Sequence, residues 1–193
     1  MSKVFFDTSM SLDGYMTASG QTEENPMGPG GEQLVAWAFG EDERDRQILT
    51  EGVAGTGAVI AGRRTYSTSL PWWGADGPTG DARLPVFVVT HQAPSDAPQD
   101  GVYTFVTDGI EEALRRAKEA AGDKNVTIMG GADLGQQYLR AGLIDELSIH
   151  LVPVLLGGGT RMFENFGEEQ VKLDPVEVTP TTAATHLRLR VAR

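Results

Sequence analysis

The fold is decided by one stretch of this 193-residue chain, Val126-Thr127-Ile128-Met129-Gly130-Gly131-Ala132-Asp133-Leu134-Gly135. Its first four residues are apolar or β-branched and predict a buried strand, and a helix is expected over Gln136–Arg140. The two glycines between them allow backbone N–H groups to approach an anion closely, because no Cβ intervenes. Their spacing is not that of the Rossmann fingerprint, and a double glycine is also a simple way to reverse a chain. The stretch therefore indicates a strand that ends in a phosphate-binding turn.

Similar short apolar runs precede this stretch, at Val4–Met10, Ala58–Ala61 and Pro85–Thr90. Helices are expected between the runs, at Glu32–Phe39, Asp42–Glu51, Thr65–Ser69 and Ile110–Ala121. This alternation predicts an α/β fold with a mixed, mostly parallel sheet flanked by helices. Ligands in such sheets bind beyond the carboxyl ends of the parallel strands.

The last third of the chain has a different pattern. A long strand is expected over Ile144–Leu156, followed by a C-terminal antiparallel hairpin of Val171–Val178 and Thr182–Val191. In the second arm, leucines and a valine alternate with His186 and two arginines, which predicts one buried side and one wet side.

Composition limits the function classes. The formal net charge is −11, which argues against nucleic acid as a general partner, and a local arginine pair is therefore informative. The chain has no cysteine, which excludes zinc-thiolate sites, and no metal is expected. No apolar run approaches the roughly 20 residues of a membrane span or resembles a signal peptide. We expect one domain over residues 1–193, in the cytoplasm and away from membranes.

Three further segments follow predicted strands and are candidates for ligand contact. The first is Gly62-Arg63-Arg64-Thr65-Tyr66, where Thr65 is expected to cap a helix and the arginines to bind phosphate. The second is Thr90-His91, and the third is Ser11-Leu12-Asp13-Gly14, a strong turn signal. Each segment is also consistent with an ordinary turn carrying solvated side chains.

Together these segments resemble the dihydrofolate-reductase-like fold, and more narrowly the RibD C-terminal family, which is the reductase domain of riboflavin biosynthesis, with stand-alone bacterial relatives. The resemblance also rests on Gly142–Leu147 and on Pro153–Gly159, which occur in family order. It implies NADPH as hydride donor and a homodimer. It also implies that the cofactor contacts Thr8, Ser9, Asp13, Gly14, Gly62, Arg63, Arg64, Thr65, Thr90, His91, Gly130, Gly131, Ala132, Asp133 and Leu134.

The chain departs from its relatives in two respects. The bifunctional riboflavin enzyme carries a zinc deaminase domain, and here the chain starts at the reductase strand without any cysteine. Dihydrofolate reductase uses one acid on its first long helix, whereas this chain offers Asp42, Glu43 and Asp45 without a spacing that selects one. Most helix acids are solvated, which is the favoured interpretation of these three.

Trp72 and Trp73, in a Gly/Pro-rich segment, are interpreted either as a wall of the substrate pocket or as a local hydrophobic plug. The resulting prediction is an NADPH-dependent reductase. It transfers hydride to a small heterocycle, which is pyrimidine, pterin or flavin-related, as in 5-amino-6-(5-phosphoribosylamino)uracil reductase or dihydrofolate reductase. The alternative is a non-catalytic nucleotide-binding module of the same fold.

Overall fold

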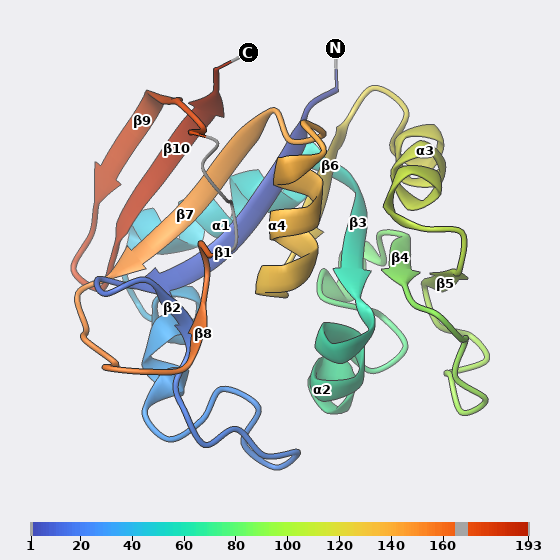
Figure 1. Cartoon of the computed structure of the whole chain (residues 1–193), viewed down its shortest axis with the longest axis horizontal. Coiled ribbons are helices and arrows are strands. Elements are labelled where there is room, and N and C mark those ends of the chain that lie inside the picture. Colours follow the sequence, from blue (N-terminus) through green and yellow to red (C-terminus); the bar gives the residue numbers. More distant parts are fainter. Residues whose placement is uncertain (1, 165–169, 193) are drawn as a thin grey trace.

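The computed structural model describes residues 2–164 and 170–192. Met1, 165–169 and Arg193 belong to the expected domain of residues 1–193 but lie outside the described residues. Within the described residues, an eight-stranded sheet has the order β5-β4-β3-β6-β1-β7-β10-β9 (Figure 1). Its strands are β1 (Val4–Ser11), β3 (Thr56–Gly62), β4 (Val86–Val89), β5 (Tyr103–Val106), β6 (Asn125–Met129), β7 (Glu146–Val152), β9 (Leu173–Pro180) and β10 (Thr185–Val191).

The sheet is parallel from β5 to β7, and β10 pairs antiparallel with both β7 and β9. The predicted mixed, mostly parallel sheet with a C-terminal antiparallel hairpin is therefore confirmed. A small second sheet pairs β2 (Tyr15–Thr17) with β8 (Thr160–Arg161). The parallel strands place their carboxyl ends on one edge, where the loops between strands and helices gather.

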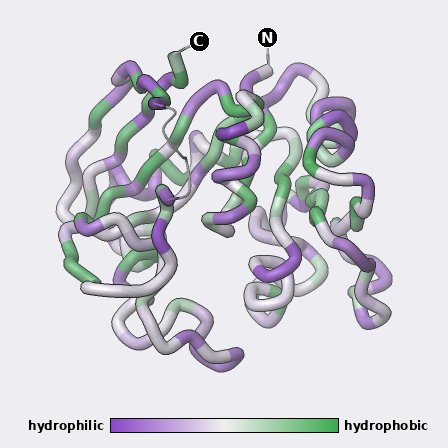
Figure 2. The backbone as a smooth tube through the Cα atoms, in the orientation of Figure 1, coloured by the Kyte–Doolittle hydropathy of each residue, from purple (hydrophilic) through white to green (hydrophobic). Residues whose placement is uncertain are grey.

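Helices cover both faces of the sheet. They are α1 (Glu43–Gly55), α2 (Arg63–Trp73), α3 (Ile110–Ala121), α4 (Ala132–Arg140) and the 3₁₀ helices η1 (Gly31–Phe39) and η2 (Gly80–Ala82). Figure 1 shows α4 in front of the central strands and α1 behind them. Apolar residues colour the central strands in Figure 2, as expected for strands that are covered on both faces.

The α4 face of the sheet holds the largest apolar cluster, in which Val4 and Phe6 of β1 pack with residues of α3 and α4. Helix α4 approaches β1 closely because residue 135 is glycine. A Cβ on Gly135 would lie 2.1 Å from Phe6 Cζ. This close contact fixes the position of α4, and with it the turn at Gly130-Gly131 that precedes the helix.

The opposite face is covered by η1 and α1 at the carboxyl ends of β7 and the start of β10. Leu34 and Trp37 of η1 are buried there against Val152 and Ala184. This coverage extends over His186, which is also buried. The prediction that the His186 side of β10 is wet is therefore wrong at this position, although Arg188 and Arg190 on the same side are exposed.

Both ends of the described chain are held by one residue, Asp145. The Val4 N–H donates to Asp145 Oδ2, the Asp145 N–H donates to the Val4 carbonyl, and the Val191 N–H donates to the Asp145 carbonyl, each at 2.9 Å. Figure 1 shows the two termini on the same side of the molecule. This side is the amino-end edge of the parallel strands.

Several predicted boundaries differ from those observed. The long strand expected over Ile144–Leu156 is confined to β7, because Pro153 has no N–H for the ladder. The helix expected at Thr65–Ser69 begins at Arg63 and includes both tryptophans, so Thr65 is not its cap and Trp72 and Trp73 are helical rather than in a loop. The helix expected from Gln136 begins at Ala132. Strand β5 was not predicted.

Candidate functional site

A large cavity opens at the carboxyl ends of the parallel strands. Its volume of about 1820 Å³ exceeds the roughly 300–1,000 Å³ that is usual for small-molecule sites. The predicted cofactor residues that line it are Thr8, Ser9, Gly62, Arg63, Arg64, Thr65, Thr90, His91, Gly130, Gly131, Ala132, Asp133 and Leu134. One cavity thus brings together segments that are far apart in the sequence.

The double-glycine turn lies directly against the first turn of α2. A Cβ on Gly130 would lie 2.9 Å from Thr65 Cγ2, and a Cβ on Gly131 would lie 3.2 Å from Thr65 Oγ1. Both glycines have positive φ, at 61° and 71°. Since a side chain at either position would be strained and would crowd Thr65, the turn requires glycine. The result is a cradle of bare backbone at the N-termini of α2 and α4, where N–H groups and partial positive charge suit an anion.

The two arginines of α2 have different environments. Arg63 is partly buried beside the ring of Tyr66, with its guanidinium carbon 5.6 Å from the ring centroid. Its Nη1 atom is buried and has no hydrogen-bond partner among the residues that the structure describes. Arg64 is exposed and donates to Gln21 Oε1 at 2.7 Å. An unpartnered buried guanidinium nitrogen in a cavity that also holds an anion cradle is suited to binding a phosphate group, so these residues fit a phosphorylated dinucleotide.

The segment after β4 contributes less free hydrogen-bonding capacity. The Thr90 hydroxyl donates to the Gln92 carbonyl at 2.8 Å, and the Gln92 N–H donates to the Thr90 hydroxyl oxygen at 3.3 Å. His91 is exposed at the cavity rim. Thr90 therefore stabilises its own turn, and the imidazole is the freer group of the pair.

Asp13 and Gly14 are not part of the cavity lining. The Asp13 carboxylate instead accepts hydrogen bonds from the Ser11 hydroxyl at 2.6 Å, from the Leu156 N–H at 3.1 Å and from the Gly157 N–H at 2.7 Å. The Ser11 hydroxyl and these N–H groups lower the pKa of Asp13 to about 2. Asp13 thus joins the loop after β1 to the glycine-rich segment after β7.

Trp72 and Trp73 both line the cavity, but from the end of α2. Trp72 is exposed, with 67% of its surface accessible, and Trp73 packs against the cluster around Val59 and Tyr66. Trp73 therefore matches the hydrophobic plug, whereas Trp72 offers an exposed ring at the cavity wall.

The three helix acids, Asp42, Glu43 and Asp45, lie in different environments. Asp42 is the N-cap of α1 and accepts from the Arg44 N–H at 2.9 Å, which, with the Thr182 contacts, lowers its pKa. Glu43 is exposed. Asp45 is 1% exposed, so the expectation of a solvated acid is wrong for it, because α1 packs Asp45 onto the sheet. None of the three lines the cavity.

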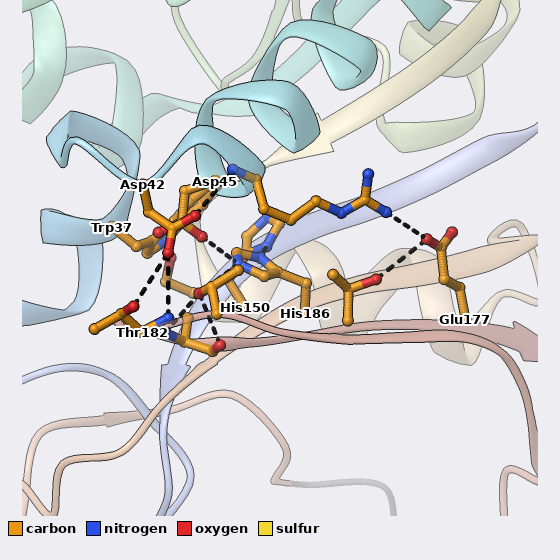
Figure 3. A network of polar contacts seen from close by, with 12 residues as sticks. Trp37, Asp42, Asp45, His150, Glu177, Thr182 and His186 are labelled. Atoms are coloured by element: carbon orange, nitrogen blue, oxygen red, sulfur yellow. Dashed lines mark hydrogen bonds and ion pairs between the residues drawn. The ribbon is translucent and has the colours of Figure 1, made fainter.

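Asp45 belongs to a buried polar chain that is not evident from the sequence (Figure 3). Its Oδ1 lies 2.7 Å from His186 Nε2, and His186 Nδ1 lies 2.7 Å from His150 Nδ1. His150 Nε2 lies 3.3 Å from Asp7 Oδ2, and Asp7 and His150 line the cavity. We call these four residues, Asp45, His186, His150 and Asp7, the Asp–His chain. It connects the buried face of α1 to the cavity.

Trp37 encloses the Asp–His chain. Its ring lies 4.1 Å from the His150 ring and 4.9 Å from the His186 ring, and its Nε1–H donates to Ser9 Oγ at 2.9 Å. Burial alone would raise the pKa of Asp7, but the charge and hydrogen bond of His150, with Ser148, outweigh it and hold that pKa below its usual value. Burial lowers the pKa of His186, against the opposing effect of Asp45.

The sequence contains only a weak signal for this chain. His150 interrupts an apolar strand, and strand pairing aligns it with both Ser9 and His186. Such a register cannot be read from one strand alone. Among residues 2–164 and 170–192, no three or more His, Asp or Glu side chains are arranged so that they could hold a metal ion. No helix in the described part is both long and apolar enough to cross a membrane.

The sheet order and the cavity at its carboxyl edge define an α/β protein with the dihydrofolate-reductase-like fold. The chain belongs to the RibD C-terminal domain family, whose model matches residues 2–187. This family and its solved structural neighbours are reductase-like.

Two curated relatives from Bacillus subtilis (strain 168) match part of the chain. They are the uncharacterized proteins YwjB, 35% identical over 74 residues, and YyaP, 34% identical over 64 residues. The matches cover 38% and 33% of this chain and 42% and 34% of the relatives, respectively. The chain thus spans less than half the length of these relatives.

Solved structures match the whole fold at low identity. A protein from Shewanella sp. PV-4, provisionally assigned to riboflavin biosynthesis, has a TM-score of 0.74 and 20% identity over 99% of both chains. The deaminase/5-amino-6-(5-phosphoribosylamino)uracil reductase of Thermotoga maritima has a TM-score of 0.71 and 15% identity, over 99% of this chain and 57% of that one. A pyrimidine reductase-like protein from Corynebacterium diphtheriae has a TM-score of 0.64 and 14% identity, over 100% of this chain and 92% of that one.

Proposed function

We propose that this protein is an NADPH-dependent reductase that reduces a small heterocycle related to a pyrimidine, pterin or flavin. The observation that carries the proposal is a single cavity lined both by the Gly130-Gly131 cradle, which is packed on Thr65, and by Arg63, whose buried Nη1 has no partner among the described residues. The reductase-like family and the size of the cavity support it.

In this proposal the glycine turn and the start of α4 hold the pyrophosphate through backbone N–H groups. Arg63, with Arg64 at the rim, binds the 2′-phosphate by charge-assisted hydrogen bonds. Thr8 and Ser9, at the carboxyl end of β1, flank the nicotinamide. When bound, the cofactor supplies the hydride, and the protein supplies orientation and a pocket that excludes water.

The alternative, a non-catalytic nucleotide-binding module, depended on the lack of an obvious acid near the site. Asp7 and His150 are titratable groups that line the same cavity. Their position favours an enzyme over a module that only binds.

The test is titration of the purified protein with NADPH and NADH, followed by nicotinamide fluorescence and by the melting temperature. We expect saturable binding that prefers NADPH. The Arg63→Ala change should weaken NADPH by about 10- to 100-fold, the equivalent of one charged hydrogen bond of about 1.5–3 kcal/mol, and NADH much less.

Arg115→Ala is the matched control, because it removes an exposed arginine of α3 that pairs with Glu112 away from the cavity. Equal weakening of both cofactors by Arg63→Ala would contradict the 2′-phosphate assignment. Failure of the wild-type protein to bind either cofactor would contradict the reductase function.

We also propose that the protein works in the cytoplasm as a homodimer formed by one domain over residues 1–193. Strand β9 supports the dimer, because it is an edge strand with exposed Val176 and Val178. Light scattering coupled to size-exclusion chromatography should give twice the 20.7 kDa chain mass, and a monomer would exclude the dimer.

A further inference from the structure

The Asp–His chain spans four elements of the fold. Asp7 comes from β1, His150 from β7, His186 from β10 and Asp45 from α1, and three short contacts connect them in sequence. One end of the Asp–His chain is shielded from solvent, because Asp45 is 1% exposed. The other end reaches the cavity, where the Asp7 side chain is 32% exposed. A buried carboxylate and two buried imidazoles are costly to desolvate unless each is hydrogen-bonded.

Counting protons shows what these contacts require. Each of the three contacts needs one hydrogen between two heteroatoms. Two neutral imidazoles supply two hydrogens, and two ionised carboxylates supply none. Asp45 accepts from His186 Nε2–H, which leaves His186 Nδ1 as the acceptor for His150 Nδ1–H. His150 Nε2 then has no hydrogen to offer Asp7 unless the chain carries a third proton.

The surroundings of the chain favour the Asp7–His150 end for this third proton. The pKa of Asp7 is lowered and that of His186 is lowered, which favours an ionised Asp7 and a neutral His186. The Trp37 ring, 4.1 Å from His150, offers a π face to an imidazolium. The titratable groups around His150 in the described residues are Asp7, His186 and Asp45, since η1 contributes only Trp37 here.

We propose that the Asp–His chain stores one proton at the His150–Asp7 end and delivers it to the substrate that accepts the hydride. The delivery step rests on the proposed reductase function, whereas storage is a property of the free protein. Asp7 and His150 are the catalytic residues in this proposal. His186 and Asp45 are positioning residues that fix the tautomer of His150.

In this step the electron-poor carbon of a C=N bond would accept the hydride that bound NADPH would supply, and the π electrons of that bond would move to the nitrogen. That nitrogen takes the proton of the His150–Asp7 pair, either from Nε2–H directly or through the Asp7 carboxyl group. The C=N bond would be reduced at the expense of NADPH, and the Asp–His chain would keep two protons until solvent at the cavity returns the third.

Storage is tested by NMR of the free protein with ¹⁵N-labelled imidazoles. The protein has three histidines, and exposed His91, which lies outside the Asp–His chain, is the internal control. At pH 7 we expect His150 to be doubly protonated and His186 to be the neutral Nε2–H tautomer. In Asp7→Asn the amide can itself donate to Nε2, so His150 should become neutral at pH 7. Two neutral histidines in the wild-type protein would overturn the proposal.

Delivery is tested by following NADPH oxidation against pH with two probe acceptors, dihydrofolate, which takes hydride at the carbon of its C=N bond, and FMN, which takes hydride at N5. Asp7→Asn should keep NADPH affinity within about threefold but lower kcat by about 10²- to 10⁴-fold, the usual contribution of a general acid. The control is Glu24→Gln, which changes another cavity carboxyl outside the chain and should leave the pH profile in place.

The outcomes distinguish the two proposals. An unchanged kcat and pH profile in Asp7→Asn would overturn delivery alone. No turnover of either acceptor, with NADPH bound, would overturn delivery and count against the reductase function. The NMR result on the stored proton, positive or negative, holds in both cases, because it is measured on the free protein.

Discussion

Replacing Gly135 by alanine tests the packing that positions the anion cradle. The new Cβ would lie 2.1 Å, 2.3 Å and 2.7 Å from Phe6 Cζ, Cε1 and Cε2, against ordinary carbon contacts of about 3.5–4.0 Å. Phe6 is 1% exposed and packs in the largest apolar cluster, so its ring cannot turn away freely. The helix must therefore move away from β1, or the ring must leave its rotamer.

The expected magnitude follows from two opposing effects. Overpacking in a core typically costs about 1–3 kcal/mol, and three overlapping ring atoms place this site at or above the upper limit. The higher helix propensity of alanine raises the free energy of unfolding by about 1 kcal/mol relative to glycine. The free energy of unfolding should therefore fall by about 2 kcal/mol or more, which lowers Tm by about 4–8 °C for a chain of this length.

The assay is chemical and thermal unfolding, with Gly52→Ala as the matched control. Gly52 also lies inside a helix, α1, but in the described part of the chain no atom beyond its own helix turn and chain neighbours lies within 4 Å of a Cβ built on it. The same substitution should therefore raise the free energy of unfolding by about 0.5–1 kcal/mol. The two variants should shift in opposite directions.

A stability for Gly135→Ala equal to or above that of the wild-type protein would refute this reasoning. A second check is the double variant with Phe6→Leu, which makes room for the methyl group. Its loss should be smaller than the sum of the two single losses, because the residues are in direct contact.

Two further predictions concern single hydrogen-bonded groups. Above about pH 4 the low pKa of Asp13, about 2 against its usual 3.8, stabilises the fold, and this contribution is lost as pH falls toward 2. The free energy of unfolding, measured at stepped pH, should therefore decline less steeply between about pH 4 and 2 in Asp13→Asn than in the wild-type protein. An unchanged slope would count against this assignment. The Thr56 hydroxyl donates to the Gly52 carbonyl and accepts from the Thr127 hydroxyl, each at 2.8 Å. Thr56→Val should lower the free energy of unfolding by about 1–3 kcal/mol, because it leaves the Thr127 hydroxyl unpaired, whereas Thr127→Val should lower it by only about 1 kcal/mol. The reverse order in urea unfolding would contradict the assignment of donor and acceptor.

The central part of the sheet could be predicted because its strands carry a local pattern. Strands β3, β4 and β6 are short apolar runs that end in glycine or polar residues, and the double glycine marks the exit of β6. Strand β5 lacks this pattern, since it is an edge strand in which only Val106 is buried. An edge strand gains its structure from one neighbour rather than from its own burial pattern.

The Asp–His chain could not be predicted because it depends on contacts between distant segments. Asp45 lies among Glu43, Arg44 and Arg46, which is the usual setting of a solvated helix acid. Its burial results from the packing of α1 on β10, 141 residues away. Likewise, His186 alternates with arginines that are exposed, and only the coverage by η1 and α1 separates it from them.

The pairing of both chain ends with Asp145 has a practical consequence for handling the molecule. The ends meet at the amino-end edge of the sheet, and the cavity lies at the opposite edge. A tag or surface tether on either end should therefore leave the cavity open. The same proximity should allow circular permutation, with a short linker between the ends and new termini in the exposed turn Gly122–Lys124. In such a permuted chain β1, which pairs in the middle of the sheet, would no longer be the first strand of the sequence.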